Sequence, residues 1–197
     1  MKTLRSLILI PGVLGFCLSA TAQNPQGDVE LRKAAQDGDV KAVNELIRLE
    51  ADVNGRDKKG RTPLLWAAPA RDNPLMIHIL VANGADVNAS DKDGETALMI
   101  AASQSNAGNV KALLELGARV NAVNKAGSTA LMAAAFRANL PEIKLLLANG
   151  ADIKVKDKKG RTAYDVATKG STNYRDELNK QRFAEALELL KIRSKAS

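Results

Sequence analysis

The chain has 197 residues, of which 45% are apolar, 26% charged and 3% aromatic, and its formal net charge is +7. This composition is typical of one folded domain, or two small ones, and excludes a disordered or collagen-like protein. With one cysteine, Cys17, and one histidine, His78, the chain lacks the residues for a cysteine–histidine catalytic pair or a multi-histidine metal site, so we expect no metal and no cofactor. Few aromatic residues and a moderate charge also argue against nucleic-acid binding.

The first 22 residues have the pattern of a cleavable signal peptide. Lys2 and Arg5 precede an apolar stretch at 7–18, and small residues at 20–22 provide a cleavage site after Ala22. The apolar stretch is shorter than the roughly 20 residues that a spanning helix needs, although retention as an anchor stays an alternative. We therefore expect an exported protein, in the periplasm or secreted, with no membrane span after cleavage.

Two short motifs recur along the rest of the chain with the same period. The first is Gly-x-Thr-x-Leu/Tyr, and its threonines are Thr62, Thr96, Thr129 and Thr162, which lie 34, 33 and 33 residues apart. The second, Ala-x-Val/Ile, begins at Ala51, Ala85, Ala118 and Ala151, with the same three spacings. Two independent markers with one period indicate an internal structural repeat.

Each repeat carries the local signals of a turn followed by two helices. The four threonines each precede an alanine-rich stretch and can cap a helix, and Pro63 suits a first helical turn. A second apolar run at helical spacing follows, as at 143–147. A glycine then ends the second helix, and an Asp-x-x-Gly string predicts a tight turn before the next repeat. These glycines are Gly84, Gly117 and Gly150, and the turns lie at 57–60, 91–94 and 157–160.

The string Thr62-Pro63-Leu64-Leu65-Trp66-Ala67-Ala68 resembles the Thr-Pro-Leu-His-x-Ala motif of ankyrin repeats, whose period is about 33 residues. The residues in place of the motif histidine are Leu65, Met99, Met132 and Asp165. We therefore expect turns that are less rigid than those of consensus repeats. The resemblance implies an all-α solenoid of helix-turn-helix repeats with β-turn or hairpin tips, about five repeats including the caps.

The two terminal repeats have the character of caps. The first places Arg32 and Lys33 where inner repeats are apolar, and the fifth continues into a polar insertion and a long final helix at 176–192. The residues that this helix is expected to bury are Leu178, Phe183, Leu187 and Leu190. The predicted segments are a signal peptide at 1–22, a loose N-terminus at 23–27, repeats at 28–56, 57–90, 91–123, 124–156 and 157–193, and a tail at 194–197.

The resemblance makes the turn tips and the exposed side of the first helices the candidate binding surface. The tips of repeats 2 and 5 share the basic string Asp-Lys-Lys-Gly-Arg-Thr and the middle tips are nearly neutral, which favours a partner with an acidic patch. Lysines kept for solubility are the alternative. Phe136 beside Arg137 is the strongest hot-spot candidate. The candidate residues are Arg56, Lys58, Lys59, Arg61, Arg71, Lys92, Glu95, Lys125, Phe136, Arg137, Lys158, Lys159 and Arg161.

Other conspicuous residues are interpreted as structural. Trp66 occupies a position that resembles an inward leucine of the motif, so we expect it in the core, and the two methionines at the motif-histidine positions are expected to pack between repeats. His78 is expected on the exposed side of a second helix. The aspartates of the second motif recur once per repeat, which indicates a turn rather than a catalytic pair. We therefore identify no catalytic residue.

The sequence favours a non-enzymatic protein–protein interaction module, monomeric, that docks a periplasmic partner on a concave face of tips and first helices. Two alternatives remain open: a secreted effector that binds a host protein, and a binder of a polyanion. An enzyme would need a carboxylate site that does not follow the repeat, and the sequence contains no such pattern.

Overall fold

A computed structural model of the chain describes residues 25–70, 72–171 and 177–195, and the predicted signal peptide and Arg71 lie outside these ranges. Ten α-helices occupy the described part. In chain order they are α1 (Pro25–Asp37), α2 (Val40–Arg48), α3 (Pro63–Ala67), α4 (Pro74–Ala82), α5 (Ala97–Ser103), α6 (Ala107–Glu115), α7 (Ala130–Arg137), α8 (Leu140–Ala148), α9 (Ala163–Ser171) and α10 (Glu177–Lys195).

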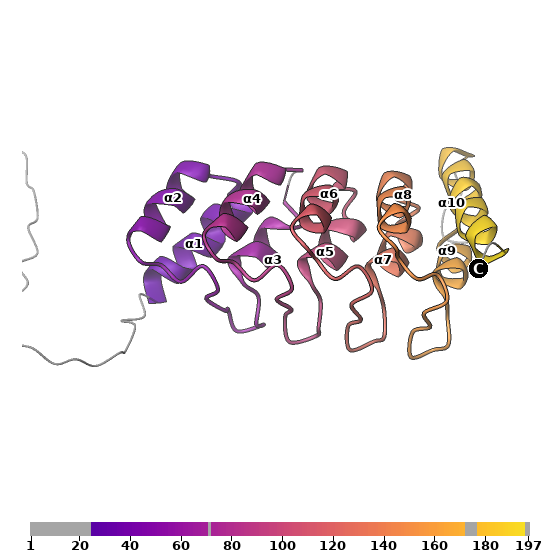
Figure 1. Cartoon of the computed structure of the whole chain (residues 1–197), viewed down its shortest axis with the longest axis horizontal. Helices are drawn as coiled ribbons and strands as arrows, with labels where there is room; N and C mark the ends of the chain where they lie inside the picture. The colour runs from indigo at the N-terminus through magenta and orange to yellow at the C-terminus, as the bar shows by residue number, and fades with distance from the viewer. Residues whose placement is uncertain (1–24, 71, 172–176, 196–197) are drawn as a thin grey trace, which may run out of the picture.

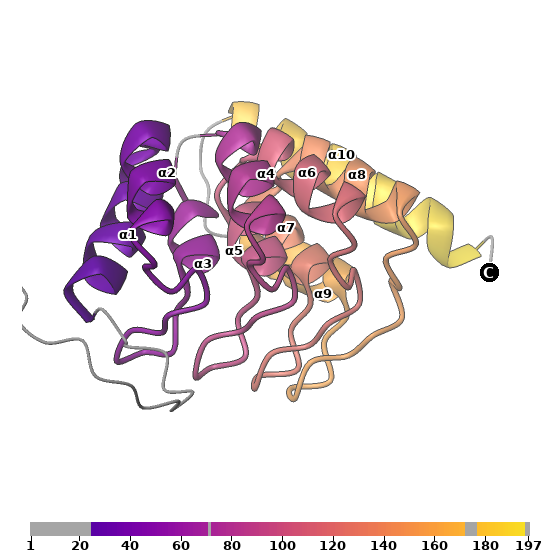
Figure 2. The same ribbon diagram turned by 60° about the vertical axis from the view of Figure 1, so that its left-hand side comes forward.

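The helices form two rows along the length of the molecule (Figure 1). The first helices α1, α3, α5, α7 and α9 make one row, and the second helices α2, α4, α6, α8 and α10 make the other. The loops between repeats project side by side in one direction (Figure 2). Among the described residues the extended structure is limited to one isolated bridge, between Ser90 and Thr96. The prediction of an all-α repeat solenoid is confirmed.

Threonine side chains begin three of the first helices, as the sequence predicts. Oγ1 of Thr62, Thr96 and Thr129 accepts a hydrogen bond, 3.3–3.4 Å long, from the backbone N–H three residues later. This bond satisfies one of the helix N–H groups that lack an intrahelical partner. Pro63 lies in the first turn of α3, where its missing N–H costs nothing.

The fourth threonine, Thr162, makes the same bond and also bonds to an aspartate side chain. Oδ2 of Asp165 accepts hydrogen bonds from the backbone N–H and the hydroxyl of Thr162, both at 2.8 Å, and Thr162 Oγ1 accepts from the N–H of Asp165 at 3.4 Å. This reciprocal pair is a capping box at the start of α9. Asp165 therefore has a structural role at the position where the other repeats place a buried Leu65, Met99 or Met132.

A continuous apolar layer between the two rows forms the core. Leu64, Leu98 and Leu131 from successive first helices are fully buried, and the second helices contribute side chains such as Ile77 and Ile143. Neighbouring first helices meet through buried alanines, whose small side chains permit close approach. These alanines are Ala67, Ala68, Ala101, Ala102, Ala134 and Ala135. Each repeat thus buries its apolar face only against its neighbours.

An asparagine directly after the second motif ties each of the first three repeats to the next one. The side-chain amide of Asn121 donates to the carbonyl of Gly150 at 3.1 Å, and its oxygen accepts from the N–H of Asp152 at 2.8 Å. Asn88 and Asn54 make the same pair of bonds one and two repeats earlier. The fourth repeat has Lys154 at this position, and the fifth repeat carries no further copy of the motif. The asparagine is therefore present where the next repeat has the same motif and is replaced where it does not.

The ends of the array differ from the sequence-based expectation. Residues 23–27 were expected to be loose, but α1 begins at Pro25, because proline fits the first helical position. The tail at 194–197 was also expected to be loose, but α10 continues to Lys195.

Leu178 was expected to be buried and is 69% exposed, whereas Phe183 and Leu190 are buried and Leu187 is half-buried. Leu178 lies five residues before Phe183, and that spacing rotates it about 140° around the helix from the side that packs. The remaining members of the buried side of α10 follow helical spacing from Phe183 to Ala186 and Leu190.

Candidate binding surface

The turn tips are built around one acidic or amide side chain per repeat. Oδ1 of Asp57 accepts hydrogen bonds from the backbone N–H groups of Lys59 and Arg61, at 2.8 and 2.9 Å. Asp91, Asn124 and Asp157 make the same two contacts in the following tips. Gly60 closes its tip with φ +81°, and a Cβ there would lie 3.1 Å from the backbone nitrogen of Lys92. The tip geometry therefore requires glycine at that position.

Neighbouring tips are joined to one another by backbone hydrogen bonds. The N–H of Lys92 donates to the carbonyl of Lys59, the N–H of Lys125 to that of Asp93, and the N–H of Lys158 to that of Ala126, each at 2.9 Å. The four tips thus form one connected row rather than four separate loops.

Three of the candidate arginines also hold the tips together. Nη1 of Arg56 donates to the carbonyl oxygens of Gly60, at 2.9 Å, and Ser90, at 2.6 Å, so it links two adjacent tips. Arg61 pairs with Asp57 at 3.0 Å, and Arg161 pairs with Asp157 at 2.6 Å. The charges of Arg61 and Arg161 are therefore already partly balanced within the molecule.

The electrostatics of the two tip aspartates follow from these contacts. Burial alone would raise the pKa of Asp57, but the N–H groups of Arg61 and Lys59 and the Arg61 guanidinium lower it below its usual value. The side-chain hydrogen bond from Arg161 lowers the pKa of Asp157 in the same way. Both carboxylates stay ionised at neutral pH.

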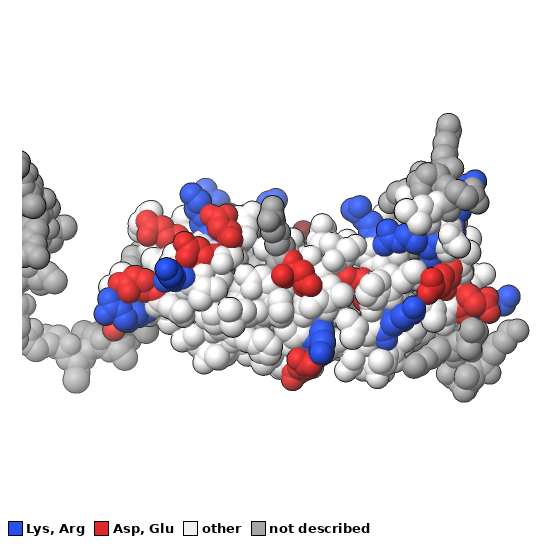
Figure 3. All heavy atoms as spheres, turned by 90° about the horizontal axis from the view of Figure 1, so that it is seen from above, with Lys and Arg blue, Asp and Glu red and all other residues white. Residues whose placement is uncertain are grey.

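The six candidate lysines all lie exposed on the row of tips. They are Lys58, Lys59, Lys92, Lys125, Lys158 and Lys159. Glu95, which was grouped with them, is half-buried and accepts a hydrogen bond from the side-chain amide of Asn124, so it links two neighbouring tips. The face over the second helices carries acidic and basic side chains side by side (Figure 3). Net positive charge on the tips thus comes mainly from the lysines of repeats 2 and 5.

Trp66 is not a core residue, contrary to the sequence-based interpretation. Its ring is half-buried, the Arg61 guanidinium lies 3.6 Å above the ring centre, and its indole N–H donates to Asp57 Oδ2 at 3.2 Å. The side chain points toward the tips because this position faces the loop row, as the half-buried Ile100 and Ala133 do in later repeats. Comparing these equivalent positions could have revealed the placement.

Trp66 lines a hollow of about 570 Å³ between α1 and the tip of repeat 2. Its other walls come from Asp28, Val29, Arg32, Lys33, Gln36, Arg56, Asp57 and Lys58. This hollow gives the N-terminal half of the surface an aromatic side chain surrounded by cations. Sequence reasoning did not assign Val29, Arg32 or Lys33 to a binding surface.

Phe136 and Arg137 lie at a second hollow, of about 340 Å³, near the middle of the first-helix row. Phe136 is 42% exposed, and Arg137 is also exposed. Glu95 and Arg161 line the same hollow, so the structure brings together four of the candidate residues from three repeats. Arg71, the remaining first-helix candidate, lies outside the described residues.

We call the surface formed by the first helices and the row of tips the inner face. The residues interpreted as structural behave as predicted apart from Trp66: Met99 and Met132 are buried in the core, and His78 is exposed on α4. Asp52, Asp86 and Asp152 each accept a backbone N–H two residues later, within a turn. In the described ranges no three or more histidine, cysteine or acidic side chains gather in a possible metal site.

Two family models for ankyrin repeats match the chain. A model for three copies of the repeat matches residues 31–124, and a model for many copies matches residues 113–167. Together they span most of the two helix rows and all the described tips. The chain belongs to the ankyrin repeat family. No curated protein sequence gives a significant match.

Ankyrin repeats are generally protein–protein interaction modules, and the family is typically non-enzymatic. The family thus implies a protein partner for this ankyrin array. None of the helices in the described part of the chain is both long and apolar enough to cross a membrane.

Proposed function

We propose that this ankyrin protein is a non-enzymatic binding module that docks one partner protein on its inner face. The observation that carries the proposal is the connected row of tips, which presents exposed lysines from a backbone held by tip-to-tip hydrogen bonds. A pre-organised surface loses little conformational freedom when it binds. The two hollows beside the row offer the aromatic and arginine side chains that dominate binding energy in protein interfaces.

The charge distribution supports a partner with an acidic patch. Lys58 and Lys59 lie at one end of the tip row and Lys158 and Lys159 at the other, and a nearly neutral stretch separates them. Opposite charge on a partner would steer its approach and raise the association rate, an effect that salt weakens. We therefore propose salt-sensitive binding.

The proposed site of action is the periplasm. The proposal rests on the signal-peptide pattern of residues 1–22. Fractionation of the producing cells tests it: we expect the chain in the periplasmic fraction with residue 23 as its new terminus. Recovery of the chain mainly in the culture medium would favour the secreted effector instead, and an intact N-terminus would contradict the cleavage.

Affinity capture tests the binding function. The mature chain from residue 23 is immobilised and exposed to an envelope extract, beside a variant with Lys58, Lys59, Lys158 and Lys159 changed to Glu. A matched control carries four reversals on the second helices, at Lys41, Lys111, Lys144 and Lys180. We expect one partner that the wild type and the control retain and the tip variant loses. Capture of the same proteins by the wild type, the tip variant and the control would contradict the inner-face proposal. Loss of many acidic proteins from the tip variant would favour a polyanion binder.

A further inference from the structure

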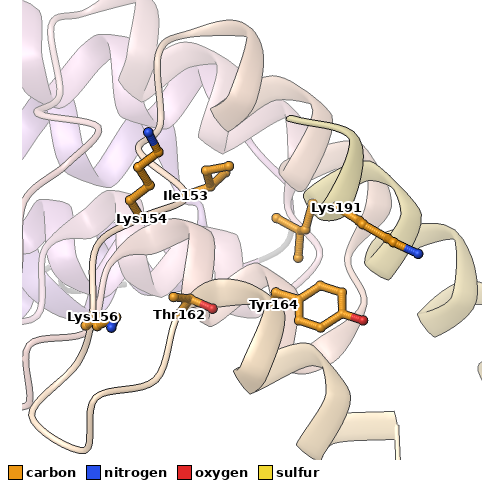
Figure 4. Close-up of a pocket in the computed structure, with 7 residues that line it drawn as sticks. Ile153, Lys154, Lys156, Thr162, Tyr164 and Lys191 are labelled. Atoms are coloured by element: carbon orange, nitrogen blue, oxygen red, sulfur yellow. The ribbon is translucent and has the colours of Figure 1, made fainter. Parts of the chain in front are cut away.

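A third hollow, of about 420 Å³, lies at the C-terminal end of the array, between the loop that leads into repeat 5, α9 and α10. Figure 4 shows the Tyr164 ring and Ile153 at this hollow, with Lys154, Lys156 and Lys191 around it. Thr162 and Leu190 complete the lining. None of these residues belongs to the candidate inner-face set.

The hollow exists because the array ends here. Tyr164 occupies the position of Leu64, Leu98 and Leu131, which are fully buried where a further repeat follows. Tyr164 itself is 41% exposed. Helix α10 packs on α8 and α9, and its Leu190 forms one wall, but it does not cover the tyrosine. The end of the stack therefore keeps an open apolar surface.

The rim of the hollow is cationic. Lys154 stands where the three preceding repeats have the asparagine that binds the next repeat, and its side chain is exposed. Lys156 adds a second ammonium group, and the flexible lysine stems can reach a ligand from several directions. Asp165 interacts with the charge of Lys156, but its carboxylate is held by Thr162 in the capping box.

We propose that this hollow binds a small amphipathic organic anion, an aromatic or aliphatic carboxylate or sulfonate. Its apolar body would lie against Tyr164, Ile153 and Leu190, and its acid group would face Lys154 and Lys156. The volume falls in the range of small-molecule sites, which combine apolar walls with a few polar groups that set orientation. This site is independent of the partner-binding function proposed for the inner face.

Anilinonaphthalene sulfonate is a suitable probe, because it is an aromatic anion whose fluorescence rises in an apolar site. Titrated into the mature chain, it should bind one saturable site, and decanoate should displace it. Lys154→Glu with Lys156→Glu should weaken binding by about tenfold. The matched double variant Lys58→Glu with Lys59→Glu, on the tip of repeat 2, should bind as the wild type does.

Tyr164→Ala provides a second variant, which is expected to fold because the ring is partly exposed. This substitution should also weaken binding of the probe. When the wild type is titrated with the probe, the amide chemical shifts of residues 153–164 should move. The proposal would be overturned if the two lysine double variants bound the probe with equal affinity. It would also be overturned if the fluorescence did not saturate, or if the chemical shifts that move belonged only to other residues. If the Lys154/Lys156 variant fails to fold, unchanged binding by Tyr164→Ala overturns it alone.

Discussion

Trp66, Arg61 and Asp57 form one unit in the tip of repeat 2. The aspartate holds the arginine and the indole N–H at once, and the arginine covers the ring. Losing the carboxylate therefore frees both partners and exposes the ring to water. Repeat 5 repeats the same basic string and the same aspartate–arginine pair without a tryptophan.

Asp57→Ala should accordingly shift the emission of Trp66, the only tryptophan, to longer wavelength and lower the free energy of unfolding by about 1–2 kcal/mol. Fluorescence spectra and urea titrations measure the two effects. Asp157→Ala is the matched control and should leave the emission unchanged. If both substitutions shift the emission equally, the unit does not exist in solution.

Glu142 is a buried carboxyl group at the start of α8. It is 1% exposed, and its Oε2 has no hydrogen-bond partner. Burial raises the pKa of Glu142, with Asp72 acting in the same direction and Arg182 opposing it. An acid whose pKa is higher in the folded state stabilises the fold below the unfolded value, near 4.5, and loses this contribution as the pH rises through the folded pKa.

Glu142→Gln should therefore increase the free energy of unfolding at pH 7 by about 1 kcal/mol, because it removes a buried charge that is incompletely paired. The difference from wild type should shrink as the pH is lowered toward 4.5. Urea titrations at a series of pH values check both statements. A variant that is less stable than wild type at pH 7 would show that the charged form of Glu142 is instead well accommodated.

The asparagines that link successive repeats are expected to contribute to the free energy of unfolding. Asn121→Ala removes two hydrogen bonds from repeat 3 to repeat 4 and should cost about 1 kcal/mol of unfolding free energy. Lys154→Ala changes the equivalent position in repeat 4, where no further copy of the motif follows, and should change stability by less than about 0.5 kcal/mol. Chemical denaturation of the two variants measures both changes in the free energy of unfolding. Equal losses would mean that the asparagine contributes nothing beyond its own turn.

Helix α10 offers a second pair of matched substitutions. Phe183 is buried and packs against Gly170 of α9, where an added Cβ would lie 2.8 Å from the phenyl ring. Phe183→Ala should lower the unfolding free energy by about 3 kcal/mol or more and expose the end of the array. Leu178→Ala, on the exposed side, should be nearly neutral. Thermal melts that show similar shifts for both would contradict the role of α10 as a cap.

Helix starts and repeat positions could be predicted from the sequence because they depend on local chemistry. A threonine before an alanine-rich run and a glycine after an apolar run act on the nearest backbone groups, so Thr62 and Gly84 identify their elements without tertiary information. The orientations of Trp66 and Leu178 depend instead on which side of a helix meets a neighbour. The sequence placed Arg56 among the partner-binding residues. Its hydrogen bond to Ser90, 34 residues away, could not be predicted because no feature of the neighbouring sequence indicates it.

At the scale of the whole molecule, the repeats form one extended surface with different chemistry on its two sides. The tips and first helices bring together lysines, two arginine-lined hollows and two exposed or half-exposed aromatic rings. The second helices carry mixed charge and the exposed His78 (Figure 3). We therefore predict that the partner binds the tips and first helices and not the second helices.

Site-specific photo-crosslinking tests this claim most directly. A photoreactive side chain is placed at Phe136 on the inner face and, as the control, at His78 on α4, and each variant is irradiated with the envelope extract. We expect a covalent adduct of one defined size from the Phe136 position and none from the His78 position. Adducts of equal yield from both positions, or from His78 alone, would contradict it.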